Sequence, residues 1–329
     1  MGDPNYPLRY INRLLNLSNS FMPSRIFLTA LELGLFEEVA DQQLTASQIA
    51  QRLDTDRRAT EILLNALTGM NLLEKKGNLF ANSEEVAELL MPDGVNSLNR
   101  LFGHTLTLWE AWSGLTQIIR SGHPHKKRWT DEMRLNLALA MKERSKGKAE
   151  TLAMMVDCFD AGSMLDLGGG PGSFGIVFAR YFPQLNVVIF DKDEHAQRLA
   201  GEEIAKENLQ DRVTLKKGDF FAGSIGDDYD LVLLSSIICL FGSTEISLLL
   251  EKVKASLKSG GRVLVWDMML DESRTKPISS AIFAVNMLVN THCGRSYSVS
   301  EVKEFLHSSG FKDMCLIPMG DFQAVIGIR

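Results

Sequence analysis

From about residue 163 to the end, short apolar runs alternate with segments of helical periodicity, and this alternation restricts the fold more than any other feature. Alternating strands and helices form a mostly parallel sheet with helices on both faces. The final stretch, KDMCLIPMGDFQAVIGIR, predicts two more strands that would form a hairpin at the sheet edge. The other predicted strands lie in SMLDLGGG, NVVIFD, VTLKKGD, YDLVLLSS and RVLVWDMML. We therefore predict an α/β fold with a Rossmann-like sheet for residues 156–329.

The first part of the chain predicts helices and one small sheet. Residues 8–42 have helical spacing of Leu and Ile, with Ser24 as a candidate N-cap. Residues 45–82 then follow the order helix, turn, helix and β-wing, in which Thr45 can cap the first helix and Gly77 turns the wing. This is the order of a winged helix.

A winged helix can bind DNA or pack against another chain. A DNA-reading helix presents polar and basic side chains to the major groove. The second predicted helix carries only Arg57 and Arg58 at its start, followed by Leu, Ile, Ala and Met. We therefore favour packing or dimerisation and keep a DNA-binding regulator as the alternative.

Composition excludes several function classes. The formal net charge of −6 argues against a general nucleic-acid binder. The four cysteines show no close pairing of metal-ligand type, so we expect no metal. No uncharged apolar stretch reaches the length of about 18 residues that a membrane span needs, so we expect no membrane insertion. Scattered cysteines without a signal peptide predict a cytoplasmic protein.

The stretch LDLGGGPGSFGIVFA places a glycine loop between a strand and a helix. Glycines let a ligand approach the main chain, and the helix supplies unpaired N–H groups and a positive dipole end. Such a turn binds a phosphate or a carboxylate. A Walker A loop is excluded because no Gly-Lys-Ser/Thr follows the glycines.

Three acids around this loop distinguish between possible ligands. Asp191 closes the second strand, where a carboxylate receives ribose hydroxyls, and Asp166 can orient the loop from the end of the first strand. Asp219 and Phe220 follow the third strand, where a carboxylate can bind an amino group while a ring stacks on a purine. Ribose, adenine and an amino-acid tail together make S-adenosylmethionine (SAM).

The order and spacing of these motifs resemble the SAM-dependent small-molecule O-methyltransferases, which have the class I methyltransferase fold. This family includes plant caffeate and hydroxyindole enzymes and bacterial carotenoid and bacteriochlorophyll enzymes. The resemblance is carried by LDLGGGPGSFG, FD at 190–191, GDFF at 218–221, LLEKVKASLKSGGRVLVWD and NTHCGRSYSVSEVKEFLHSSGF.

The resemblance implies a division of the chain into three parts. Residues 1–95 would form a winged-helix dimerisation domain, 96–155 a helical linker that roofs the acceptor pocket, and 156–329 the SAM-binding domain. In the polar loop of the middle part, the basic run Lys126–Arg128 is expected to be a solvated surface.

The resemblance also implies roles for single residues. Gly168 and Gly170 would meet the amino-acid tail of SAM, with Ser235 near that tail. Asp191 would bind the ribose, and Asp219 with Phe220 would hold adenine. Each of these glycines could instead be only a tight turn, and Phe220 could be a core residue.

The loop after the fourth strand, SSIICLFGSTE, lacks the His that serves most relatives as the general base. Cys239 stands in its place. Cys239 could be the base, but an ordinary thiol titrates near 8.5, so this requires a nearby cation or helix N-terminus. It could also be a packing residue or a neutral pocket wall. His292 could serve instead, because imidazole suits proton removal. No base is needed if the acceptor is an activated carbon, a thiolate or an amine.

Other residues are candidates for the acceptor pocket. His104 would sit on the helical roof, whereas His123 and His125 are interpreted as loop residues. Asn286, Met287 and Asn290 should face the acceptor, and the two Asn residues share a helix face because they are four apart. The pocket is thus predicted to be mostly apolar with few polar anchors.

Taken together, the sequence predicts a homodimeric SAM-dependent methyltransferase that acts on a medium-sized, largely apolar metabolite. The acceptor atom stays open between O, C, S and N. The alternatives are a C-methyltransferase of a pigment or polyketide, and a SAM-binding protein that no longer methylates.

Overall fold

The computed structural model describes residues 6–91, 98–125 and 128–329, and the chain forms two compact units, 1–106 and 107–329. Each unit is described by itself below. The predicted run Lys126–Arg128 lies partly outside the described residues. No helix within the described ranges is both long and apolar enough to cross a membrane.

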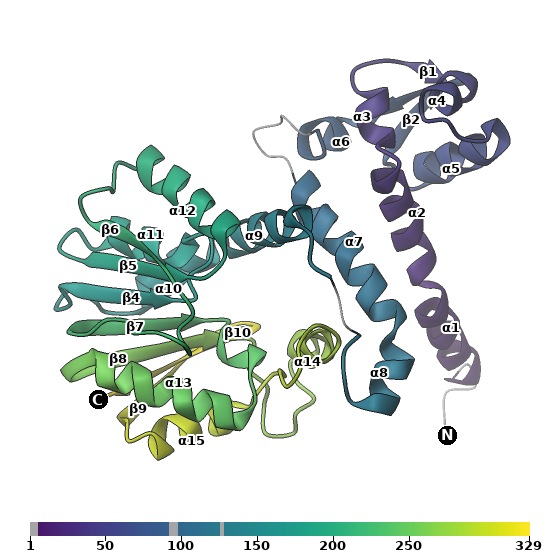
Figure 1. The fold of residues 1–329 in the computed structure, drawn as a ribbon. Helices are drawn as coiled ribbons and strands as arrows, with labels where there is room; N and C mark the ends of the chain where they lie inside the picture. Colours follow the sequence, from purple (N-terminus) through teal and green to yellow (C-terminus); the bar gives the residue numbers. More distant parts are fainter. Residues whose placement is uncertain (1–5, 92–97, 126–127) are drawn as a thin grey trace. The chain divides into compact units, whose positions relative to one another are not determined.

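The first unit is mostly helical and contains one small sheet (Figure 1). Its three strands are ordered β1-β3-β2, and all neighbours are antiparallel. The order helix, turn, helix and hairpin that the sequence predicts is present as α4, α5, β2 and β3. The elements are α1 (Tyr6–Asn19), α2 (Phe21–Glu32), α3 (Leu35–Val39), β1 (Leu44–Thr45), α4 (Ala46–Arg52), α5 (Arg57–Gly69), β2 (Leu73–Lys76), β3 (Leu79–Asn82) and α6 (Glu84–Leu89).

Side-chain caps fix the starts of α4, α5 and α6 in this unit. Thr45 and Gln48 form a capping box at α4, as the sequence predicts for Thr45, and Asp56 caps α5 through the Ala59 N–H. The predicted cap at Ser24 is wrong, because α2 begins at Phe21. Pro23 explains this start: proline lacks an N–H and fits without cost only in the first turn of a helix.

The second unit contains a seven-stranded sheet with the order β6-β5-β4-β7-β8-β10-β9. Strands β4 to β8 run parallel, and β10 is antiparallel to both β8 and β9, which forms the predicted terminal hairpin. The strands are β4 (Ser163–Leu167), β5 (Asn186–Asp191), β6 (Val213–Lys217), β7 (Tyr229–Ser235), β8 (Leu257–Asp267), β9 (Lys312–Met319) and β10 (Phe322–Ile328). The predicted strands are therefore confirmed.

Helices cover both faces of this sheet (Figure 1). One apolar core layer lies under α10 and α11, and the other under α13 and α15. The helices are α8 (Leu115–Ser121), α9 (Asp131–Ser145), α10 (Lys148–Met155), α11 (Ser173–Tyr181), α12 (Glu194–Lys206), α13 (Ser243–Ser256), α14 (Ile278–Asn290) and α15 (Val299–Ser308), and α7 (Asn99–Ser113) spans the boundary between the units.

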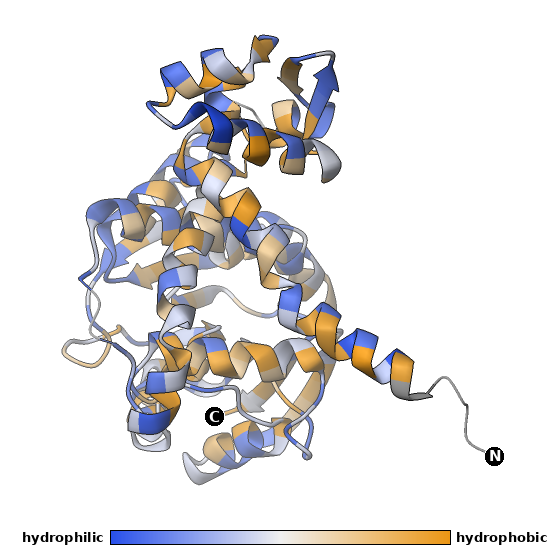
Figure 2. Ribbon diagram, turned by 90° about the vertical axis from the view of Figure 1, so that its right-hand side faces the viewer, coloured by the Kyte–Doolittle hydropathy of each residue, from blue (hydrophilic) through white to orange (hydrophobic). Residues whose placement is uncertain are grey.

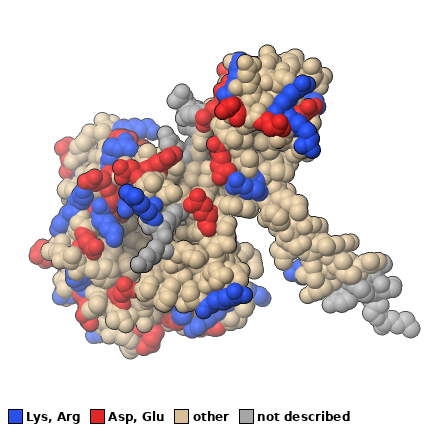
Figure 3. Space-filling view, turned by 45° about the vertical axis from the view of Figure 1, so that its right-hand side comes forward, with Lys and Arg blue, Asp and Glu red and all other residues tan. Residues whose placement is uncertain are grey.

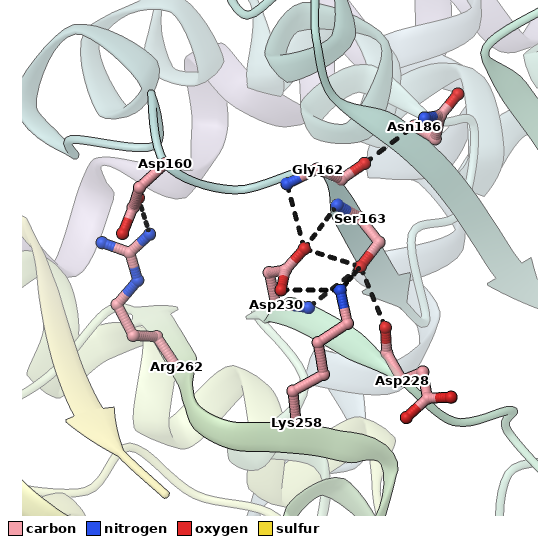
Figure 4. A network of polar contacts seen from close by, with 8 residues as sticks. All are labelled: Asp160, Gly162, Ser163, Asn186, Asp228, Asp230, Lys258 and Arg262. Carbon is pink, nitrogen blue, oxygen red and sulfur yellow. Dashed lines mark hydrogen bonds and ion pairs between the residues drawn. The ribbon is translucent and has the colours of Figure 1, made fainter.

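A polar network ties the amino ends of the central strands together (Figure 4). The Asp230 carboxylate of β7 accepts hydrogen bonds from the Gly162 and Ser163 N–H groups at the start of β4 and pairs with Lys258 at 2.8 Å. Partial burial raises the pKa of Asp230, but these donors together outweigh it and lower the pKa. These bonds hold the amino ends of the strands together. The candidate site lies at the opposite edge of the sheet, at the carboxyl ends of the same strands.

Candidate active site

The glycine loop follows β4 at the carboxyl edge of the parallel strands, where ligands bind in open α/β sheets. Gly168 and Gly170 have positive φ angles of 74° and 55°, so both positions favour glycine. A Cβ at Gly168 would overlap the Ile237 side chain, whereas a Cβ at Gly170 would meet no atom within 4 Å. The main chain at Gly170 is therefore open to a ligand.

Asp191, the last residue of β5, holds this loop. Its Oδ2 accepts the Gly170 N–H at 2.8 Å, and its Oδ1 accepts the Asp193 N–H at 2.8 Å. Burial raises the pKa of Asp191, although these donors partly offset the effect. Each carboxylate oxygen keeps further acceptor capacity, so the side chain can bind two neighbouring hydroxyls. Asp193, not Asp191, caps α12.

Asp166 supports the loop from below. It is fully buried at the end of β4, and its Oδ2 accepts the Gly175 N–H at 2.9 Å. Burial raises its pKa to about 7. A Cβ at Gly169 or Gly175 would press on this carboxyl group, so the glycines make room for the acid as well as for a ligand.

The third acid and its aromatic neighbour lie in the turn after β6. The Asp219 carboxylate accepts the Phe221 N–H at 2.9 Å and lies 3.9 Å from the Lys192 ammonium. The half-buried Phe220 ring contacts Phe221 and Phe241, with ring centroids 4.9 and 5.9 Å away.

Ser235 ends β7 beside this loop, and the following Ser236 adopts a positive φ of 54°. This left-handed residue turns the chain out of the strand and into the short 3₁₀ helix η1 (Ile238–Leu240).

A cavity of about 770 Å³ opens over the loop. Gly170 and Asp191 line it, while Gly168, Asp219, Phe220 and Ser235 do not. Trp129 and Met141 also line this cavity, and the sequence did not predict either of them as a site residue. Met141 belongs to the run MRLNLALAM in α9, which has the pattern of an ordinary packing helix and gives no signal of a ligand wall.

Cys239 lies in η1 and is 2 % exposed. Its Sγ lies 3.4 Å from the Ser236 carbonyl oxygen, and its N–H donates to Asp267 Oδ2 at 3.2 Å. Burial, with the nearby Asp267 carboxylate adding to it, raises the pKa of the Cys239 thiol well above its ordinary value. Burial also raises the pKa of Asp267, to about 6. The thiol is therefore neutral, which favours a buried packing residue over a thiolate base.

The histidines are spread over different places. His292 is exposed and stacks on His123, with ring centroids 5.2 Å apart and planes at 8°. His104 is buried on α7 in the first unit. His125 lines a second cavity of about 180 Å³ together with Glu110 and Asn290.

The predicted acceptor residues lie on α14. Asn286 Oδ1 accepts the Trp112 indole N–H at 3.1 Å and an Asn290 amide N–H at 3.2 Å. The two Asn side chains are thus on one helix face and held in one network, as their spacing predicts. Met287 is buried. Trp112 was not predicted, because its partner is 174 residues away.

Comparison with known proteins decides the family. Residues 102–312 match the O-methyltransferase domain, and residues 15–93 match the O-methyltransferase dimerisation domain. The chain belongs to the O-methyltransferase family. Membership confirms the predicted class I methyltransferase fold, a SAM-dependent methyltransferase for small molecules, and SAM as the cofactor.

Relatives of this O-methyltransferase match over nearly the whole chain. A 3-hydroxy-5-methyl-1-naphthoate 3-O-methyltransferase of Streptomyces sahachiroi is 30 % identical and covers 92 % of this chain and 89 % of its own. The tetracenomycin polyketide 8-O-methyltransferase TcmO of Streptomyces glaucescens is 28 % identical, with 94 % of each chain covered. The solved structure of human N-acetylserotonin methyltransferase in complex with SAM has a TM-score of 0.82 at 24 % identity, covering 100 % and 99 %.

Proposed function

We propose that this O-methyltransferase transfers the methyl group of SAM to a hydroxyl of a hydroxylated aromatic, largely apolar metabolite. The observation that carries the proposal is the Asp191 carboxylate, which is bonded to the Gly170 N–H and faces a cavity large enough for a nucleoside. The relatives named for 3-O-methylation of a hydroxynaphthoate and for 8-O-methylation in tetracenomycin polyketide synthesis support a hydroxyl acceptor on a ring.

The glycine loop and its acids fit SAM. In our proposal the main chain at Gly168 and Gly170 meets the amino-acid tail, with Ser235 nearby. Asp191 accepts hydrogen bonds from both ribose hydroxyls. Bound SAM supplies an electrophilic methyl group on a sulfonium, and the protein has to position an acceptor in line with it.

The turn after β6 would hold the adenine. The Asp219 carboxylate can accept from the exocyclic amino group while the Phe220 ring packs on the purine. Phe220 also packs against one apolar core layer of the sheet, so this ring would both support the fold and bind the base.

The acceptor would be held by α14 and its neighbours. We propose that Asn286 and Asn290 orient it through their amides and that Met287 shapes its pocket. The role expected for His104 stays a prediction. Trp112 fixes the Asn286 amide through its indole N–H. An acceptor with few polar groups suits such a site, because a buried polar atom without a partner is costly.

The N-terminal unit is proposed to form a homodimer by its winged helix and first helices. Large apolar side chains repeat along α1, and few charges interrupt them (Figures 2 and 3). Among them Leu8, Ile11, Leu14 and Leu15 are 51–62 % exposed. An exposed apolar stripe of this kind marks a protein interface, and the match to a dimerisation domain supports a second copy as its partner. A cytoplasmic location remains part of the proposal.

Titration calorimetry with SAM tests the donor site. Asp191→Ala should weaken SAM binding by at least about 100-fold, because it removes two charge-assisted hydrogen bonds. The exposed Asp227→Asn is the matched control and should bind like the unchanged protein. Equal affinity of the Asp191 variant would contradict the site. A gel shift with DNA belongs to the same experiment, since DNA binding without SAM binding would favour the regulator.

A further inference from the structure

Neither of the two candidate bases that the sequence predicts is placed to accept the proton of the acceptor hydroxyl. Cys239 is a neutral buried thiol, and His292 stacks on His123 and lines neither of the two cavities described above. An aromatic hydroxyl attacks a methyl group far better once its proton is leaving, so a general base contributes about 10² to 10⁴ in rate. Another side chain near the proposed acceptor site would therefore have to take this proton.

His125 lies in a loop after α8, yet its side chain lines the cavity that Asn290 also lines. Trp129 lines both this cavity and the larger one over the glycine loop. The Trp129 indole therefore lines both the proposed acceptor cavity and the proposed donor cavity. An acceptor bound beside His125 and Asn290 would reach the donor past Trp129.

The imidazole of His125 occupies space that a side chain at position 114 would fill. Gly114 separates α7 from α8 and has an ordinary φ of −86°, so its backbone does not require glycine. A Cβ at this position would lie 2.6 Å from His125 Nε2. The absence of a side chain at Gly114 therefore leaves room for the His125 ring. Glycine is favoured here by this steric contact and not by its backbone conformation.

The surroundings suit a group that accepts and releases protons. Among the described residues lining this cavity, Glu110 of α7 is the only other titratable one. The facing residues of α8 and α14 are Ile118, Val289 and Asn290, which carry no charge. His125 is exposed to solvent, so an accepted proton can pass to water.

We propose that His125 is the general base of this enzyme and stands in for the histidine that Cys239 replaces. The inference rests on the proposed hydroxyl acceptor. The acceptor O–H bond breaks as the oxygen–methyl bond forms, and the proton goes to a ring nitrogen of His125. The electron pair of the breaking sulfur–methyl bond stays on sulfur, and the imidazolium then loses its proton to solvent.

The test is the pH dependence of methyl transfer to 3-hydroxy-1-naphthoate and a panel of other phenols, measured with radiolabelled SAM. In the unchanged enzyme kcat should rise with pH as imidazole becomes neutral. His125→Gln should lower kcat roughly 100-fold and abolish this rise, with SAM affinity unchanged. Gly114→Ala should displace the ring and lower kcat in the same direction, whereas Gly69→Ala, where a Cβ meets no atom within 4 Å, should not.

Two matched variants separate the histidines. His123→Gln changes the neighbouring loop histidine and should keep both kcat and the pH profile. The proposal fails if His125→Gln keeps full turnover and the same profile, or if His292→Gln alone removes the acid limb. If the unchanged enzyme does not bind SAM, the proposed function itself fails. If it binds SAM but methylates no phenol, the hydroxyl acceptor fails and the role of His125 with it.

Discussion

At the scale of single residues, the proposed donor site depends on carboxyl groups that accept hydrogen bonds from backbone N–H groups. Asp191 and Asp166 each accept from the glycine loop or from the helix behind it. These two acids could be predicted from the sequence, because each ends a strand that leads into the site. Their hydrogen-bond partners could not, since the partners are main-chain groups whose direction depends on the loop conformation.

Asp166 gives a prediction about stability and pH. Its folded pKa of about 7 lies above the ordinary value of 3.8, because burial disfavours the charged form. A group with a raised folded pKa contributes stability that is complete below the unfolded pKa and is lost as pH rises through the folded pKa. Its contribution should therefore decline between about pH 4 and pH 7.

Asp166→Asn should remove this decline while keeping an acceptor for the Gly175 N–H. Relative to the unchanged protein, we expect the variant to gain on the order of a few kcal/mol of unfolding free energy between pH 5 and pH 7.5. Urea denaturation at both pH values measures the difference. A difference that is the same at the two pH values would show that Asp166 titrates in the ordinary range.

His125 shows what residue patterns miss. In the sequence it is one of several polar residues in the loop between two helices, which is the usual place for a solvated side chain. Its contact with Gly114 and its place in a cavity with Asn290 come from tertiary packing alone. The only local signal was the glycine at 114, and a glycine between two helices is normally explained by the turn.

At the scale of elements, strands were easier to predict than helix starts. The central strands are buried on both faces, so their apolar runs are continuous and end at Gly or Asp. Helix α2 begins at Phe21, three residues before the expected cap Ser24, because Pro23 fits only in the first turn of a helix. The walls of the cavities belong to α9 and to the segment with Trp129, whose sequences are those of ordinary packing elements.

Helix α1 gives the prediction at this scale. Leu14 is 53 % exposed on the apolar stripe, and burying it in a dimer is worth about 2–3 kcal/mol. Leu14→Glu should therefore weaken dimerisation roughly 100-fold or more. Light scattering after size exclusion should show a dimer for the unchanged protein and a monomer for the variant at micromolar concentration.

Asn16→Glu is the control, because it adds the same charge on a polar position of the same helix. It should remain dimeric. A monomeric unchanged protein, or a dimer that survives Leu14→Glu, would contradict the proposed interface.

At the scale of the whole molecule, the fold class and the cofactor followed from the sequence because both depend on the order of motifs along the chain. The alternation of strands and helices, the glycine loop and the acids closing successive strands occur in one segment. The proposed acceptor site could not be derived in this way. It combines α7, α8, α14 and a connecting loop, whose residues come together only in the folded chain.

The central claim is that a methyl group passes from SAM to an aromatic hydroxyl on this protein. The most direct measurement is mass spectrometry of 3-hydroxy-1-naphthoate and related phenols after incubation with SAM that carries a trideuterated methyl group. We expect a product in which one phenolic hydrogen is replaced by the labelled methyl group, and no product with Asp191→Ala. A protein that binds SAM but labels no phenol, or that labels carbon or nitrogen instead, would contradict the account.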